Sequence, residues 1–161
     1  MMTDLEGLAK SIRDYAGTEL PDGKLQASFL WHCSFLSPIA SQLLFVSDRY
    51  EAHAWRRHPI RRGRMNDSEH SNAYMAGRVD HAFRQIGPDE GHVLANTLLR
   101  GLDDPGPERT GLDGSHWYLA VTDGSAVRFV SRWSPLLCGF RHACEGLLLA
   151  TGLNLSEEDG L

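Results

Sequence analysis

The feature that most constrains the fold is a regular alternation of apolar and polar residues over residues 25–36. This period of two predicts a long β-strand with one buried face, because successive side chains of a strand point to opposite sides of a sheet. Pro38 then interrupts the strand, since proline has no N–H to donate to a ladder. The apolar positions of the predicted inner face are Leu25, Ala27, Phe29, Trp31, Cys33 and Phe35.

Two further strand candidates follow at once, over residues 39–46 and 50–55, with only a short polar turn between them. Three strands in a row with short connections predict an antiparallel meander. Residues 78–86 also alternate and favour a fourth strand, and a helix over residues 74–86 is the alternative.

The clearest local signal is a hairpin in the C-terminal third of the chain. Residues 117–122 and 127–133 both alternate, and Asp123-Gly124 lies between them. An Asp-Gly pair suits the positive φ angles of a type I′ turn, so we expect a two-residue turn that joins two antiparallel strands.

Apolar residues at helical spacing predict three helices, over residues 3–16, residues 88–101 and from residue 138 or 139 to residue 151. Thr3 and Glu6 have the spacing of a capping box at the start of the first helix. The predicted order is therefore α-βββ-β-α-ββ-α. This order is typical of an α+β fold, and we expect three helices grouped on one face of a largely antiparallel sheet of five to six strands.

A length of 161 residues fits one domain, over residues 1–161. Within it we expect an ordered core over residues 3–153. Residues 56–76 are polar and rich in arginine, which is typical of an exposed loop. Residues 154–161 form an acidic tail.

Composition limits the classes of function. The formal net charge of −5 disfavours a dedicated nucleic-acid binder, since such proteins carry a strongly basic face. There is no run of 18 apolar residues, so no membrane span is expected. The N-terminus has neither a basic start nor an apolar core, so no secretory signal is visible and the cytoplasm is the expected compartment. Three cysteines, an odd number, fit reduced thiols.

Short sequence motifs typical of common enzyme classes are absent from the sequence. It lacks the short signatures of phosphate-binding loops, dinucleotide-binding turns, serine hydrolases and zinc proteases. Its eight histidines show no zinc-site spacing. We therefore expect a protein that is not an enzyme and needs no metal or cofactor. The alternative is a small hydrolase or transferase that uses His53, His58, His70 or His81.

Five arginines occur within residues 56–64, directly after Trp55. Guanidinium groups bind carboxylates and phosphates through paired hydrogen bonds, and an indole ring offers a flat face for a cation. We expect a partner-binding site formed by Trp55, Arg56, Arg57, Arg61, Arg62 and Arg64. A nucleic-acid-binding module that uses the segment Arg56–Arg64 is a further alternative, which the acidic net charge disfavours.

Three stretches of the C-terminal half carry a resemblance. They are Gly111-Leu112-Asp113-Gly114 followed by Trp117, Arg132-Trp133-Ser134-Pro135, and the closing helix from Phe140-Arg141 through Leu147-Leu148 to Gly152-Leu153. They resemble a group of small bacterial α+β proteins found in toxin–immunity neighbourhoods. Some members are similar to immunity proteins of contact-dependent or type VI secretion effectors. The resemblance covers about residues 29–153, and its sharp matches lie within residues 111–153.

This chain departs from that group at one position and in one segment. Ala120 stands where many members have an acidic residue, and the arginine-rich segment replaces a glycine-rich one. The resemblance implies an immunity protein that binds a cognate toxin or effector and neutralises it by steric occlusion. It specifies neither the toxin nor the oligomeric state.

Overall fold

A computed structural model describes residues 5–17, 22–33, 38–58, 78–111 and 114–155. These residues form three helices and six strands in the order that the sequence predicts, and the fold is α+β. The elements are α1 (Leu5–Ala16), β1 (Lys24–Cys33), β2 (Ile39–Val46), β3 (Arg49–Arg57), β4 (Val79–Ile86), α3 (Pro88–Gly101), β5 (Ser115–Thr122), β6 (Val127–Trp133) and α4 (Gly139–Thr151).

The six strands form one antiparallel sheet in the order β4-β3-β2-β1-β5-β6. β1, β2 and β3 form the predicted meander, β4 extends it by one strand, and β5 and β6 form the predicted hairpin. β1 therefore lies in the middle of the sheet, where it pairs with β2 on one side and β5 on the other. Residues 79–86 are a strand, so the alternative of a helix over this segment was wrong.

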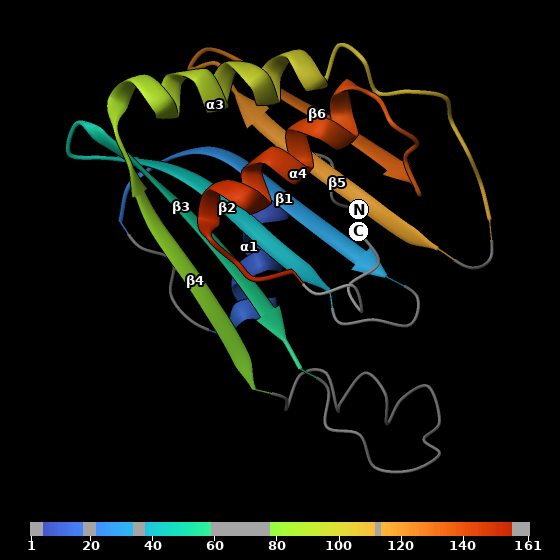
Figure 1. The fold of residues 1–161 in the computed structure, drawn as a ribbon, viewed down its shortest axis with the longest axis horizontal. Helices are drawn as coiled ribbons and strands as arrows, with labels where there is room; N and C mark the ends of the chain where they lie inside the picture. The colour runs from blue at the N-terminus through green and yellow to red at the C-terminus, as the bar shows by residue number, and fades with distance from the viewer. Residues whose placement is uncertain (1–4, 18–21, 34–37, 59–77, 112–113, 156–161) are drawn as a thin grey trace.

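The sheet lies between two helical layers. α3 and α4 cover one face, and α1 covers the other, as Figure 1 shows. The prediction that the helices share one face was therefore wrong. The physical reason lies in β1, because Ser28 and Leu30 on its second face are buried as well as Phe29 and Trp31 on its first. A central strand of a three-layer fold is covered on both sides, and its alternation does not show this.

The face under α3 and α4 holds the larger core, in which aromatic rings dominate. The ring centroid of Trp117 lies 5.5 Å from that of Phe29 and 5.2 Å from that of Trp31. Gly91 of α3 is buried against the ring of Tyr50, where a Cβ atom would overlap ring carbon Cδ2. Glycine is therefore required there for α3 to approach the sheet so closely.

The face under α1 is lined by smaller residues. Leu8 and Ile12 of α1 belong to a cluster that also contains Ala40 and Ala120 of the sheet. Small side chains let the helix approach the strands, and the apolar stripe of α1 fills the space between them.

The hairpin between β5 and β6 differs from the prediction. Thr122 pairs with Val127, so the loop has four residues, Asp123–Ala126, and the expectation of a two-residue type I′ turn was wrong. The Asp123 carboxylate accepts hydrogen bonds from the backbone N–H groups of Ser125 and Ala126, at 2.8 and 2.9 Å. These bonds lower the pKa of Asp123 to about 2. A side chain thus organises this turn, with only Gly124 at positive φ.

The start of the predicted arginine-rich loop was also placed too early. β3 continues through Arg56 and Arg57, because β4 offers Asp80 and Val79 as their cross-strand neighbours. Residues 59–77 lie outside the described residues, as do Thr3 of the capping box and residues 156–161 of the acidic tail.

Candidate functional site

The structure separates the residues of the predicted partner-binding site. Trp55 is 2% exposed and packs in the cluster under α1, and Arg57, on the same face of β3, is also buried. Arg56 lies between them in sequence and so points to the opposite face of the sheet. Arg61, Arg62 and Arg64 lie outside the described residues. Among the described positions, Arg56 alone reaches a charged, partly exposed cluster.

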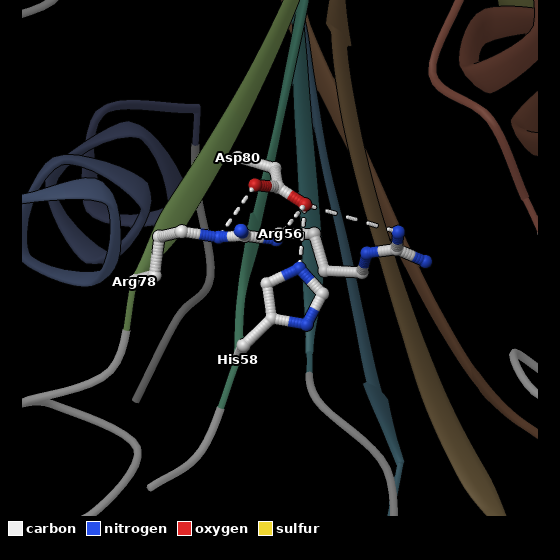
Figure 2. A network of polar contacts seen from close by, with 4 residues as sticks. All are labelled: Arg56, His58, Arg78 and Asp80. Atoms are coloured by element: carbon white, nitrogen blue, oxygen red, sulfur yellow. Dashed lines mark hydrogen bonds and ion pairs between the residues drawn. The ribbon is translucent and has the colours of Figure 1, made fainter.

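That cluster has the Asp80 carboxylate at its centre (Figure 2). Asp80 Oδ2 lies 2.5 Å from His58 Nε2 and 4.0 Å from Arg56 Nη2, and Asp80 Oδ1 lies 3.1 Å from Arg78 Nε. Three basic side chains therefore converge on one acid. We call these four residues the Asp80 network.

Strand pairing explains why the four residues meet. Arg56 and Asp80 are cross-strand partners in β3 and β4. His58 N donates a hydrogen bond to Arg78 O at 2.8 Å, which continues the ladder one pair further along the hairpin. Residues two apart on one strand share a face, so all four side chains lie on the side of the sheet that carries α3 and α4.

The charges of the Asp80 network do not cancel. The hydrogen bond from His58 is the main cause of a lowered pKa for Asp80, and Arg78 and Arg56 lower it further against the opposing effect of desolvation. Asp80 is therefore ionised at neutral pH and pairs with two permanently charged guanidinium groups. Arg78 is 74% exposed, so the surplus positive charge is presented to solvent.

A second polar cluster lies on the opposite face of the same two strands. His53 Nδ1 is 3.0 Å from His81 Nε2, and His53 Nε2 is 3.3 Å from Glu51 Oε2. The ring of Phe83 stacks on His53 with a centroid distance of 4.7 Å. We call the chain Glu51–His53–His81 the histidine relay.

The order of donors and acceptors in the histidine relay follows from its chemistry. Burial lowers the pKa of both His53 and His81, so both rings are neutral at pH 7. The Glu51 carboxylate oxygen accepts from His53 Nε2–H, so His53 Nδ1 accepts in turn from His81 Nε2–H. His81, which is exposed, is left with a basic lone pair on Nδ1. A carboxylate-oriented imidazole with this arrangement has the form of a general base.

The other histidines of the described segments do not join the relay. His58 belongs to the Asp80 network on the opposite face. His116 stacks on Tyr118 near the other edge of the sheet, with a centroid distance of 4.4 Å. His92 lies on α3, where its Nδ1 is 3.0 Å from Pro88 O. Of the four histidines in the enzyme alternative, the structure thus brings together two, His53 and His81. His70 lies outside the described residues.

Those residues of the family resemblance that the structure describes pack as one unit, and Leu112 and Asp113 lie outside the described residues. Trp117 Nε1 donates to Ser115 Oγ at 2.8 Å, and the Arg141 guanidinium lies 5.8 Å from the Trp117 ring. Ser134 Oγ accepts from Ser115 N at 3.1 Å, and Arg132 is the cross-strand partner of Trp117. These contacts hold β5, β6 and α4 together, so the motif residues have a structural role.

Within the described residues, no three His, Cys, Asp or Glu side chains are grouped so that they could hold a metal ion. The free thiol of Cys144 is buried, and desolvation raises its pKa. No described helix has the length and apolar character needed to cross a membrane.

In comparisons with known proteins, no family model, curated protein or solved structure matches this chain. The immunity-protein function is therefore a proposal that rests on the motif residues and on the surface of the molecule.

Sequence reasoning identified Arg56 and the histidines of both clusters but missed Arg78, Asp80 and Glu51. The sequence did contain a signal for Asp80. Once residues 78–86 are taken as a strand that pairs with β3, one register places an acid opposite Arg56.

Proposed function

We propose that this protein is an immunity protein that binds a cognate bacterial toxin or effector and blocks it by occupying its surface. The observation that carries the proposal is the Asp80 network. It fixes two arginines and a histidine at one end of a hairpin on a molecule whose net charge is −5. A cationic site on an acidic protein gives directional attraction for a partner with an acidic patch.

The geometry supports binding by preorganised side chains. Arg56 and Arg78 are held by a carboxylate, so they lose less conformational freedom on binding than free arginines would. Arg78 is exposed and keeps guanidinium N–H groups available for a partner carboxylate. The motif residues that resemble immunity proteins support the same function through the resemblance itself. They build the β5–β6–α4 unit, whose strands lie on the other side of β1 from this hairpin.

The test is co-expression with the product of the neighbouring reading frame, followed by a growth assay and co-purification. We expect the wild-type chain to protect the cells and to form a complex with that product. Arg78→Glu should weaken the complex at least tenfold, mainly by slowing association, and the effect should shrink at high salt.

Arg100→Glu is the matched control, because it makes the same charge change on an exposed residue of α3. It should leave the affinity within about twofold of wild type. A neighbouring product that is harmless, or a complex equally sensitive to both substitutions, would contradict the proposal. Binding of a DNA or RNA duplex that weakens steeply with salt would favour the nucleic-acid alternative instead.

The histidine relay favours a second candidate function, a histidine-dependent hydrolase or transferase. In that case His81 Nδ1 would take a proton from water or another nucleophile while Glu51 and His53 hold the ring in place. p-Nitrophenyl acetate is a suitable probe. Hydrolysis that falls at least tenfold in His81→Gln but not in His142→Gln, an exposed histidine of α4, would support this function. Equal rates in the two variants would exclude it.

A further inference from the structure

The two edge strands of the sheet, β4 and β6, differ in what borders them. Beside β6, Arg109 Nη1 donates to Ser134 O at 3.3 Å, and Gly111 lies against the indole ring of Trp133, so the segment before β5 borders the end of this strand. On the outer side of β4, no described strand follows, and Figure 1 shows β4 as the outermost strand there. Such an edge presents backbone N–H and C=O groups that can bind a further strand.

We propose that the outer edge of β4 binds an extended segment of an acidic partner protein, which continues the sheet as a further antiparallel strand. The inference rests on the proposed function for the identity of that partner, the toxin or effector, and it says how the partner is held. β4 itself is suited to pairing, because it contains no proline and its pairing with β3 runs from Val79 to Ile86 without a register shift. A proline or a bulge would hinder a further strand.

The pairing of β3 with β4 shows which backbone groups of β4 are available. His58 N donates to Arg78 O, and hydrogen-bonded pairs alternate with non-bonded pairs along an antiparallel ladder. The even-numbered residues of β4, such as Asp80 and Ala82, therefore bond inward to β3. The outward backbone groups belong to the odd-numbered residues, which are Val79, His81, Phe83 and Gln85.

The charge along this edge favours an acidic partner. Asp80 is already held by its own chain, where Arg56 and Arg78 more than balance its charge, and Arg78 is 74% exposed. Arg84 lies on the same face nearer the other end of β4. Its contact with Glu90 joins side chains that are 52% and 56% exposed, and such a pair holds an arginine only weakly. An acidic side chain opposite Arg78 and another opposite Arg84 would add two cross-strand pairs of opposite charge.

The other face of β4 fits apolar side chains. Phe83 is 48% exposed although one face of its ring stacks on His53. His81 is exposed beside it, with its ring parallel to that of Trp55 at a centroid distance of 5.1 Å. Both rings are held by their neighbours, so apolar residues opposite them would bury surface with little loss of side-chain freedom. The partner segment is therefore acidic on one face and apolar on the other, with a period of two.

The first experiment uses a synthetic probe with that pattern, the acetylated and amidated peptide Thr-Glu-Val-Thr-Tyr-Thr-Val-Glu. In antiparallel register its glutamates lie opposite Arg84 and Arg78. Its first valine and its tyrosine lie opposite Phe83 and His81. We expect saturable NMR shift changes along β4. Amide exchange of His81 and Phe83 should slow on binding, while that of Ala82, which already bonds to β3, should change little.

N-methylation of the peptide separates backbone pairing from charge attraction. Methyl groups on the nitrogens of the residues opposite Phe83 and His81 remove N–H groups that would bond to β4, so affinity should fall at least tenfold. The matched control carries its methyl groups on the residues opposite Ala82 and Asp80, where the N–H groups point away from β4. The control peptide should bind within about twofold of the unmodified one.

The charge requirement is tested on both partners. Replacing both glutamates of the peptide by lysine should weaken binding at least tenfold, and Arg78→Glu in the protein should weaken the original peptide about fivefold. Arg100→Glu makes the same charge change on α3 and should leave the affinity unchanged.

Three results would overturn the proposal: no shift changes along β4 at about 1 mM peptide, equal affinity of the two methylated peptides, or amide protection along β6 in place of β4. Failure of the proposed function is distinguishable. A chain that binds the peptide through β4 but does not protect cells retains the strand pairing and loses the immunity function. A chain that protects cells, but whose His81 and Phe83 amides exchange in the toxin complex as they do in the free chain, retains the function and loses the strand pairing.

Discussion

The two faces of the sheet are built differently although they share the same strands. The face under α3 and α4 is filled by large apolar and aromatic side chains. The face under α1 is covered by one helix of twelve residues and contains most of the buried polar groups, namely Ser28, Gln42, His53 and Arg57. From this difference we expect the face under α3 and α4 to supply most of the stability, while the face under α1 tolerates buried polar side chains.

The largest expected effect is on the apolar face. Phe140 of α4 is fully buried in the larger core. Phe140→Ala removes a ring and leaves a cavity, so the free energy of unfolding should fall by about 3–5 kcal/mol. Urea unfolding followed by circular dichroism measures it. A loss below about 1 kcal/mol would show that the two cores do not differ as described.

A smaller loss is expected on the other face. Leu8 of α1 is fully buried, but α1 packs on small side chains such as Ala40 and Ala120. Leu8→Ala should lower the free energy of unfolding by about 2–3 kcal/mol. Hydrogen exchange should accelerate in α1 more than in α4, since the two layers share only the sheet. Equal acceleration in both helices would contradict the comparison.

A third prediction concerns the buried amide of Gln42. Its Nε2 donates to Ser28 Oγ at 3.1 Å, and its Oε1 has no hydrogen-bond partner in the described structure. Ser28→Ala should cost about 1–2 kcal/mol, because it leaves the amide unsatisfied. Adding Gln42→Met should restore most of that loss. A double-mutant cycle measures the coupling, and strictly additive losses would argue against it.

The smallest expected effect is a pH dependence that arises from the polar face. Burial lowers the pKa of His53 and His81 below their ordinary value of 6.5. The unfolded chain therefore binds more protons, so stability should be complete above pH 6.5 and decline as the pH falls below it. The urea midpoint should drop between pH 7.5 and pH 5, and less so in a His53→Gln/His81→Gln variant. His142→Gln should behave like wild type.

The element order could be predicted from the sequence because periods of two and of 3.6 residues are local properties. Trp117 and Leu119 are buried on one face of β5, and Tyr118 between them is only partly buried, so the period of two is visible in this strand. The layer of each helix could not be predicted, because the burial of Leu30 depends on α1, which packs on it through tertiary contacts. The turn at Asp123 was misjudged because its side chain, and not the Asp-Gly backbone preference, determines the loop.

The candidate site was predictable only in part. The density of arginines indicated Arg56, but Trp55 and Arg57 fit equally well in the sequence and are buried on the opposite face. Which of these three residues is exposed depends on which face of β3 packs against α1. The partnership of Arg56 with Asp80 depends on a register set across the long β3–β4 connection, which no local pattern encodes.

The central position of β1 has a consequence for synthesis on the ribosome. Ser28 pairs with Ala120, so one side of β1 has no neighbour until β5 has been translated, about ninety residues after β1. During that interval the nascent chain exposes an apolar strand, because its pairing partner β5 has not yet been synthesised. Because this pairing joins segments far apart in sequence, we expect the last step of folding to be slow, and growth conditions that speed elongation or dilute chaperones should increase inclusion bodies.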